Sequence, residues 1–213
     1  MRELEDLFEL YVDEALAKLE FYKEHEALKC VNIQLVINLC SFLECFIQKY
    51  LQIFQKEDKD VWGRPLNACF SFAFYWAFGG HFRASAMRFL DNMMRDFFAK
   101  SQINTKDTVY EYFVDPKEQF RFVHYEKRLQ PFEYPTTPTP FFQLVVPTVD
   151  TKKVSTLLQM TSTVNKPIFV TGATGTGKSM IVQKFIKEAR ENERAPIVPV
   201  ELNFSAQTES RST

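Results

Sequence analysis

The chain carries the stretch Gly172-Ala173-Thr174-Gly175-Thr176-Gly177-Lys178-Ser179, which reads G-x-x-x-x-G-K-S and decides how the sequence around it folds. Glycines in such a loop let backbone N–H groups close around phosphate oxygens. A lysine at the seventh place reaches the β- and γ-phosphates as a point charge, and the serine hydroxyl after it ligates Mg²⁺. We therefore predict a site for a nucleoside triphosphate and Mg²⁺, with Lys178 as its cation and Ser179 as its metal ligand.

The flanking sequence supports this interpretation. The apolar run Pro167–Thr171 before the loop predicts a short buried strand. Met180–Arg190 after it has helical spacing, with its apolar residues on one side, namely Ile181, Val182, Phe185 and Ile186. A strand, a glycine loop and a helix in this order form the context in which the new helix offers its positive N-terminal end to phosphate.

The residues needed for hydrolysis of the nucleotide are less clearly indicated by the sequence. A triphosphatase of this class holds its metal ion partly through an acidic residue at the end of a later strand, and it needs a group that orients the attacking water. The nearest candidate acid is Glu201, which ends the strand-like segment Ile197–Glu201. The polar tail Ser205–Thr213 then closes the sequence, so we expect a nucleotide-binding domain that stops midway. The 213 residues are predicted to bind a nucleoside triphosphate but not to hydrolyse it.

Composition narrows the function classes. Hydrophobic residues make up 46% and charged residues 25%, which is ordinary for a globular chain, and the net charge of −1 gives no reason to expect nucleic acid. The apolar run Val31–Phe54 is interrupted by polar residues, so no membrane span is expected. Cysteines and histidines lack the paired spacing of a zinc site, which favours buried free thiols in a reducing, cytosolic compartment.

The fold class expected is α/β with a large helical part. Apolar residues recur every three or four positions over Leu4–Tyr22, Ile33–Phe54 and Met87–Phe98, as in amphipathic helices. Pro65 and Gly79-Gly80 are placed to open and close a further helix. Within it, Cys69–Phe74 alternates like a strand, although its neighbours favour a helix. The 22 phenylalanines imply aromatic packing between these helices.

A second pattern starts near residue 101. Val109–Val114 and Phe120–Tyr125 are rich in aromatic and β-branched residues, as strands are, and a run of prolines then indicates an extended connector. Asp150 is a plausible N-cap for a helix that leads to the phosphate loop. The expected organisation is a helical lid bundle over residues 1–100, a β-containing, proline-rich connector over 101–140, and the N-terminal half of a P-loop domain over 141–213.

Several stretches together resemble the dynein heavy chains, and most of all the axonemal ones. They are Trp62–Pro65, Phe70–Gly80, Arg88–Asp91, Val145–Thr151, the phosphate loop and Asn203–Thr208. The resemblance covers essentially the whole chain, and this combination is far more specific than the phosphate loop alone. Dynein phosphate loops often have proline where Ala173 stands, which is a mild departure.

The resemblance implies the helical lid of the second AAA+ module of a motor ring, followed by the start of the third module. In this family the third module is a regulatory ATP site, with Pro147 and Thr148 near the adenine. It also implies neighbouring AAA+ modules of the same heavy chain, other dynein subunits and microtubules as partners, and a cytoplasmic, cytoskeletal location in the ciliary axoneme. Arg83 and Arg88 are candidate phosphate sensors, although surface or lid-packing roles are favoured, and no catalytic residue is carried over.

Two other interpretations of the function stay open. The chain is a stand-alone small P-loop nucleotide-binding protein if it turns over ATP by itself with an acid such as Glu201. It is a truncated, non-enzymatic interaction fragment if its helical half folds stably and the chain has no affinity for nucleotide.

Overall fold

A computed structural model describes residues 2–56, 63–99, 106–134, 136, 140, 144–191, 198–202 and 204, without the side chains of residues 51–56 and 191. The chain forms two compact units. The first contains residues 1–136 and 146–169, and the second contains residues 137–145 and 170–213. In chain order the described elements are α1 (Arg2–Glu20), η1 (Lys23–His25), α2 (Asn32–Lys56), α3 (Gly63–Gly79), η3 (Ala84–Ala86), α4 (Met87–Phe97), η5 (Val109–Glu111), β1 (Tyr112–Asp115), η6 (Pro116–Glu118), β2 (Arg121–His124), η7 (Tyr125–Arg128), α5 (Val149–Thr163) and α6 (Lys178–Glu191).

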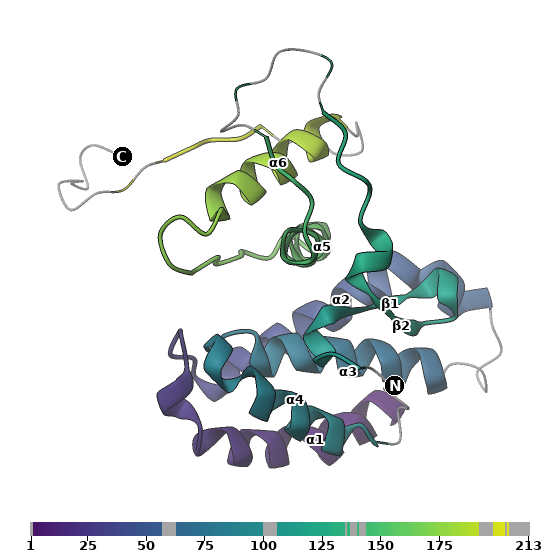
Figure 1. Ribbon diagram of the computed structural model, residues 1–213. Coiled ribbons are helices and arrows are strands. Elements are labelled where there is room, and N and C mark those ends of the chain that lie inside the picture. Colours follow the sequence, from purple (N-terminus) through teal and green to yellow (C-terminus); the bar gives the residue numbers. More distant parts are fainter. Residues whose placement is uncertain are drawn as a thin grey trace. The chain divides into compact units, whose positions relative to one another are not determined.

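The first unit is a helical bundle with α3 at its centre. Figure 1 shows α1, α3 and α4 lying alongside one another, with α2 against α3. Of the seventeen residues of α3, eleven are buried, including the whole run Ala68–Tyr75. A helix that is apolar all round has to be enclosed on all sides, so the neighbouring elements pack around it. The strand-like alternation of Cys69–Phe74 is helical here, as its neighbours favoured.

Phenylalanine fills the contacts between these helices, as the composition predicts. On one side of α3, Phe74 stacks on Phe78 with ring centroids 4.3 Å apart, and Phe70 meets Phe8 of α1 at 5.7 Å. On another side, Phe72 meets Phe46 of α2 edge to face at 5.5 Å. Offset and edge-to-face pairs of this kind add to the free energy of burial.

A small antiparallel hairpin covers the end of the bundle. Strand β1 pairs with β2 in a register that places Phe113 opposite Val123. The expected strand over Val109–Val114 is therefore only half correct, because its first three residues form the 3₁₀ turn η5. Tyr110 of that turn is 4% exposed and its ring packs on Trp76 of α3. This tertiary contact outweighs the strand propensity of the segment.

Helix α5 begins two residues earlier than expected. Thr148, not Asp150, is the N-cap: its hydroxyl accepts a hydrogen bond from the Thr151 N–H at 3.2 Å. The Thr148 N–H in turn donates to the Thr151 hydroxyl at 2.8 Å, which completes a capping box. The Asp150 side chain instead receives a hydrogen bond from Lys153.

The four cysteines are free thiols, but not all are buried as expected. Cys45 and Cys69 lie in the core, where burial raises the pKa of Cys45 to about 11 and also raises the pKa of Cys69. Cys40 is exposed, because it lies on the outer face of α2. Among the described residues no cluster of His, Cys, Asp or Glu could hold a metal ion, and every helix is too short or too polar to cross a bilayer.

We expect Gly79→Ala to destabilise the bundle. A Cβ at position 79 would collide with the ring and hydroxyl of Tyr110, which is enclosed and cannot move aside cheaply. Overpacking of this kind costs about 1–3 kcal/mol. Urea unfolding should show this loss, whereas Gly63→Ala, where a Cβ meets nothing within 4 Å, should not. Equal effects of the two substitutions would contradict the proposed collision.

Acid should weaken the bundle through His81. Its Nε2 lies 3.5 Å from the Glu26 Oε1, and each side chain is 8% exposed. Burial lowers the pKa of His81 below its ordinary value of 6.5, and Glu26 offsets this only in part. Because the unfolded chain then binds the proton more readily, the contribution of His81 to stability is complete above about pH 6.5 and is lost as the pH falls below it.

Thermal unfolding at about pH 7.5 and about pH 5.5 tests this expectation. The unmodified chain should lose more thermal stability on acidification than His81→Gln does. His25→Gln is the control, because the His25 side chain is 44% exposed, and it should behave like the unmodified chain. An identical loss in all three proteins would show that His81 is not responsible.

Candidate phosphate-binding site

The phosphate loop lies in the second unit and runs directly into α6. Helix α6 begins at Lys178, and the Ile181 N–H donates to the Gly177 carbonyl at 3.0 Å as the helix starts. Gly175 and Gly177 have φ values of 83° and 80°, which an L side chain adopts only with strain. The loop and helix expected from the sequence are thus present, and glycine is required at these two positions.

Lys178 closes the loop from inside. Its Nζ donates to the carbonyl oxygens of Gly172 at 2.8 Å and of Ala173 at 2.6 Å. Thr176 strengthens the same ring, since its hydroxyl donates to the Ala173 carbonyl at 2.9 Å. The ammonium group is therefore held where the loop folds back on itself, and it is the cation that the loop presents.

Four backbone N–H groups of the loop have no hydrogen-bond acceptor among the described residues. Within the part of the chain that the structure describes, the N–H groups of Thr174, Gly175, Thr176 and Gly177 donate no hydrogen bond. These residues are also exposed. Free N–H groups gathered at the positive end of a helix, with a lysine beside them, provide the donors that a phosphate group needs. The residues present thus fit the phosphates of a nucleotide.

Ser179 is the second residue of α6 and is exposed. Its hydroxyl makes no hydrogen bond within the described residues, so it is available to a ligand. The sequence-based role of Ser179 as a Mg²⁺ ligand is compatible with this position, and it stays a prediction.

The other candidate residues belong to other segments of the chain, and their roles in nucleotide binding stay predictions. Pro147 and Thr148 belong to the first unit, where Thr148 serves as the cap of α5. Arg83 and Arg88 are exposed residues of the first unit, beside η3 and on α4. Glu201 is exposed in a segment of the second unit without regular structure.

The two strands expected on either side of the loop are not formed. Residues 167–170 and 198–202 have no strand partner in the described ranges. Their apolar side chains are exposed, with Phe169 at 77% and Val198 at 84%, except that Val170 is half-buried. A strand is completed only by a neighbour that takes up its backbone hydrogen bonds. The burial predicted for the strand before the loop is therefore wrong, because Ile168 and Phe169 are exposed.

Sequence comparison gives the class of protein. Residues 4–127 match the family described as "Dynein heavy chain AAA lid domain", and residues 132–213 match "P-loop containing dynein motor region". The first match covers the helical bundle with its hairpin, and the second contains the phosphate loop and α6. The chain is thus an AAA lid followed by part of a P-loop motor region, which implies nucleotide binding.

The chain belongs to the dynein heavy chain family. It is similar to "Dynein axonemal heavy chain 6" of Homo sapiens, with 30% identity over 98% of this chain and 5% of that protein. "Dynein axonemal heavy chain 2" of Homo sapiens is 32% identical over 67% of this chain and 3% of its own length. "Dynein-1-beta heavy chain, flagellar inner arm I1 complex" of Chlamydomonas reinhardtii is 32% identical over 70% of this chain and 3% of its own length. The chain therefore spans only 3–5% of the length of these relatives.

Proposed function

We propose that this chain contributes the phosphate loop of a regulatory ATP site to the motor ring of an axonemal dynein heavy chain. The observation that carries the proposal is the loop itself, where four unspent backbone N–H groups and the Lys178 ammonium stand at the N-terminal end of α6. ATP is the nucleotide and Mg²⁺ the ion that this loop would take, with Ser179 as a ligand of the metal.

The proposed modules follow the sequence order. Residues 1–100 are the lid of a second AAA+ module, residues 101–140 connect the modules, and residues 141–213 begin a third. Pro147 and Thr148 would lie near the adenine. In this arrangement the lid and the phosphate loop serve different nucleotide sites of one ring, and the partners of the chain are first the neighbouring modules of the same heavy chain.

The setting proposed is the ciliary axoneme, within the cytoplasm and its cytoskeleton, where the parent motor meets other dynein subunits and microtubules. The names of the axonemal relatives support this setting. A stand-alone P-loop protein or a non-enzymatic fragment is less well supported, because two consecutive dynein regions account for nearly the whole chain.

Lys178→Ala should remove most of the affinity for ATP. Charge-assisted hydrogen bonds are worth about 1.5–3 kcal/mol, which corresponds to roughly a ten- to hundredfold weaker Kd. Titration of the full chain with a fluorescent ATP analogue in Mg²⁺ measures this. Lys184→Ala is the matched control, since it removes a lysine of the same helix that pairs with Glu188 and lies outside the loop. Equal affinity in all three proteins would refute the site.

The metal role of Ser179 has its own test. Replacing Mg²⁺ by EDTA should weaken ATP binding to the unmodified chain, because the serine hydroxyl helps to hold the ion that bridges the phosphates. Ser179→Ala should bind ATP more weakly in Mg²⁺ and should lose most of this difference between Mg²⁺ and EDTA. A variant that keeps the full Mg²⁺ dependence would exclude Ser179 as a ligand.

We expect the 213 residues to bind ATP without turning it over. Release of inorganic phosphate should stay at background, because hydrolysis needs an acidic metal ligand at the end of a later strand, and the described residues form no such strand after the loop. Phosphate release that disappears in Lys178→Ala would contradict this expectation. If the same release also disappeared in Glu201→Gln, Glu201 would be the metal acid and the stand-alone enzyme would be the better interpretation.

A further inference from the structure

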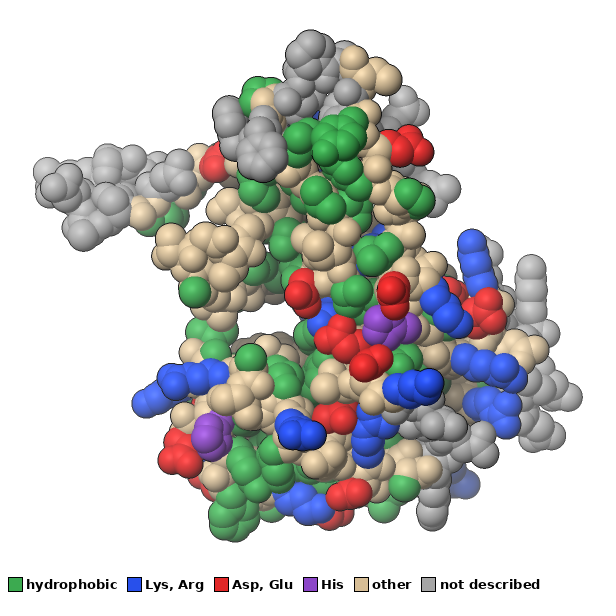
Figure 2. All heavy atoms as spheres, in the orientation of Figure 1, with side chains coloured by type: hydrophobic (Ala, Val, Ile, Leu, Met, Phe, Trp, Pro, Cys, Tyr) green, Lys and Arg blue, Asp and Glu red, His purple; other side chains and the backbone are tan. Residues whose placement is uncertain are grey.

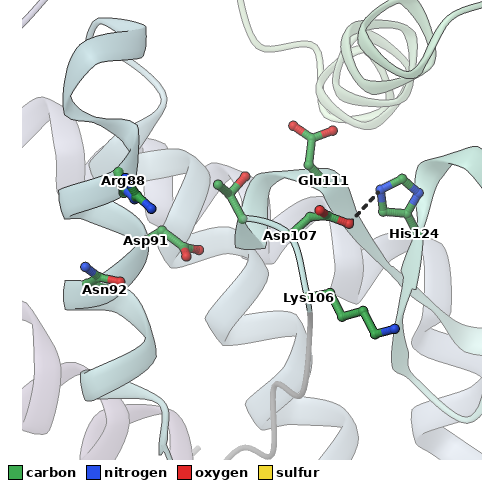
Figure 3. A pocket seen from close by; sticks show the side chains of 8 residues that line it. Arg88, Asp91, Asn92, Lys106, Asp107, Glu111 and His124 are labelled. Carbon is green, nitrogen blue, oxygen red and sulfur yellow. Dashed lines mark ion pairs between the residues drawn. The ribbon is translucent and has the colours of Figure 1, made fainter.

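A polar pocket lies in the first unit, between α4, the segment that leads into η5, and β2. Its volume is about 610 Å³, and every residue that lines it is polar or charged: Arg88, Asp91, Asn92, Lys106, Asp107, Thr108, Glu111 and His124. Figure 3 shows the α4 residues on one side and Asp107 reaching toward His124 on the other. Figure 2 shows acidic, basic and histidine side chains gathered over the face near β1 and β2. We call this hollow the lid pocket.

The acidic side chains of the lid pocket already have basic partners. Each carboxylate lies within ion-pair distance of one basic group, and the pairs are Asp91 with Arg95 at 2.8 Å, Asp107 with His124 at 3.7 Å, and Glu111 with Lys153 at 2.7 Å. The second oxygen of Asp91 accepts the Val109 N–H at 2.6 Å. Arg95 and Lys153 thus offset the charges of Asp91 and Glu111, whereas His124 offsets the charge of Asp107 only when its ring is protonated.

The donors of the lid pocket are not engaged in this way. Across the described residues, the side chains of Arg88, Asn92, Lys106 and Thr108 make no hydrogen bond and no ion pair. Arg88 and Asn92 stand one helical turn apart on the exposed face of α4. Two cations, an amide and a hydroxyl thus surround one hollow with their hydrogen-bonding capacity unused, so the ligand they suit carries negative charge and several acceptors.

We propose that the lid pocket docks an acidic segment of a partner protein, with separate carboxylate side chains bound by Arg88 and by Lys106. A free anion carries acceptors only and would leave the carboxylates of the lining without a hydrogen-bond donor from the ligand. A peptide also carries backbone N–H groups, and the Asp107 carboxylate, whose side chain is 62% exposed, can accept them. The mixed lining therefore suits a peptide better than it suits a free anion.

All the residues that line the docking site belong to the first unit, whereas the phosphate loop belongs to the second. A fluorescently labelled hexaglutamate peptide is the probe, and its anisotropy is followed on titration with the full chain at low salt. Binding is expected with hexaglutamate and not with hexaglutamine. Because exposed ion pairs are worth up to about 1 kcal/mol, Arg88→Gln and Lys106→Gln should each weaken binding roughly two- to fivefold.

Two controls make the result specific. Arg121→Gln removes one exposed cation of β2 outside the lid pocket and should bind the peptide like the unmodified chain. Lys178→Ala should also bind it unchanged, which separates this surface from the phosphate loop. Unfolding curves check that Arg88→Gln and Lys106→Gln stay folded, as expected for exposed side chains.

Three outcomes would overturn the proposal. If hexaglutamine binds as well as hexaglutamate, the negative charge of the peptide does not contribute to its affinity for the lid pocket. An equal loss in Arg121→Gln would show that only the overall charge of the chain matters. Displacement of the peptide from the Lys178→Ala chain by inorganic phosphate, at a concentration where acetate has no effect, would make the lid pocket a site for small phosphoryl groups instead.

Discussion

Burial of helix α3 is the constraint on which the rest of the first unit depends. The run Ala68–Tyr75 turns through two full helical turns without an exposed residue, so every side of the helix needs a covering element. One apolar cluster joins it to α1, α2 and α4, and a second joins it to α2, the hairpin and α5. Because both clusters contain residues of α3, a change in this helix is felt on both sides of the unit.

The lid pocket is a consequence of the same packing. Its floor is held by Asp91, an 8% exposed carboxylate of α4 that fixes the start of η5 through the Val109 N–H. Tyr110, next in that turn, is anchored under Gly79 and against Trp76 of α3. Core contacts thus fix the backbone around the pocket, whereas the side chains of Arg88 and Lys106 at its rim are exposed to solvent. A rigid floor with exposed charged groups around it is the arrangement of a recognition surface.

The sequence predicts the helices well and the strands poorly, for a physical reason. A helix satisfies its backbone internally, so the apolar spacing of Leu4–Tyr22 or Met87–Phe98 is enough to locate α1 and α4. The pattern missed the cap of α5, although the reciprocal Thr148 and Thr151 side chains could have indicated it. It also could not reveal the lid pocket, because Asp107 and His124 are brought together only by the hairpin.

The phosphate-loop region contains both a segment that forms from local interactions and segments that need a strand partner. Its shape is local: glycines at 175 and 177 supply the required φ values, α6 supplies the helix end, and Lys178 bonds carbonyls only a few residues away. For this reason the motif could be read from the sequence and the loop forms even though the strands expected beside it do not. Val198, Val200, Leu202 and Phe204 alternate along the chain and are all exposed, which is the pattern of one apolar strand face without a covering layer. Binding of phosphate therefore requires only the loop and the start of α6. Hydrolysis requires in addition an acidic residue that a completed sheet would hold in place.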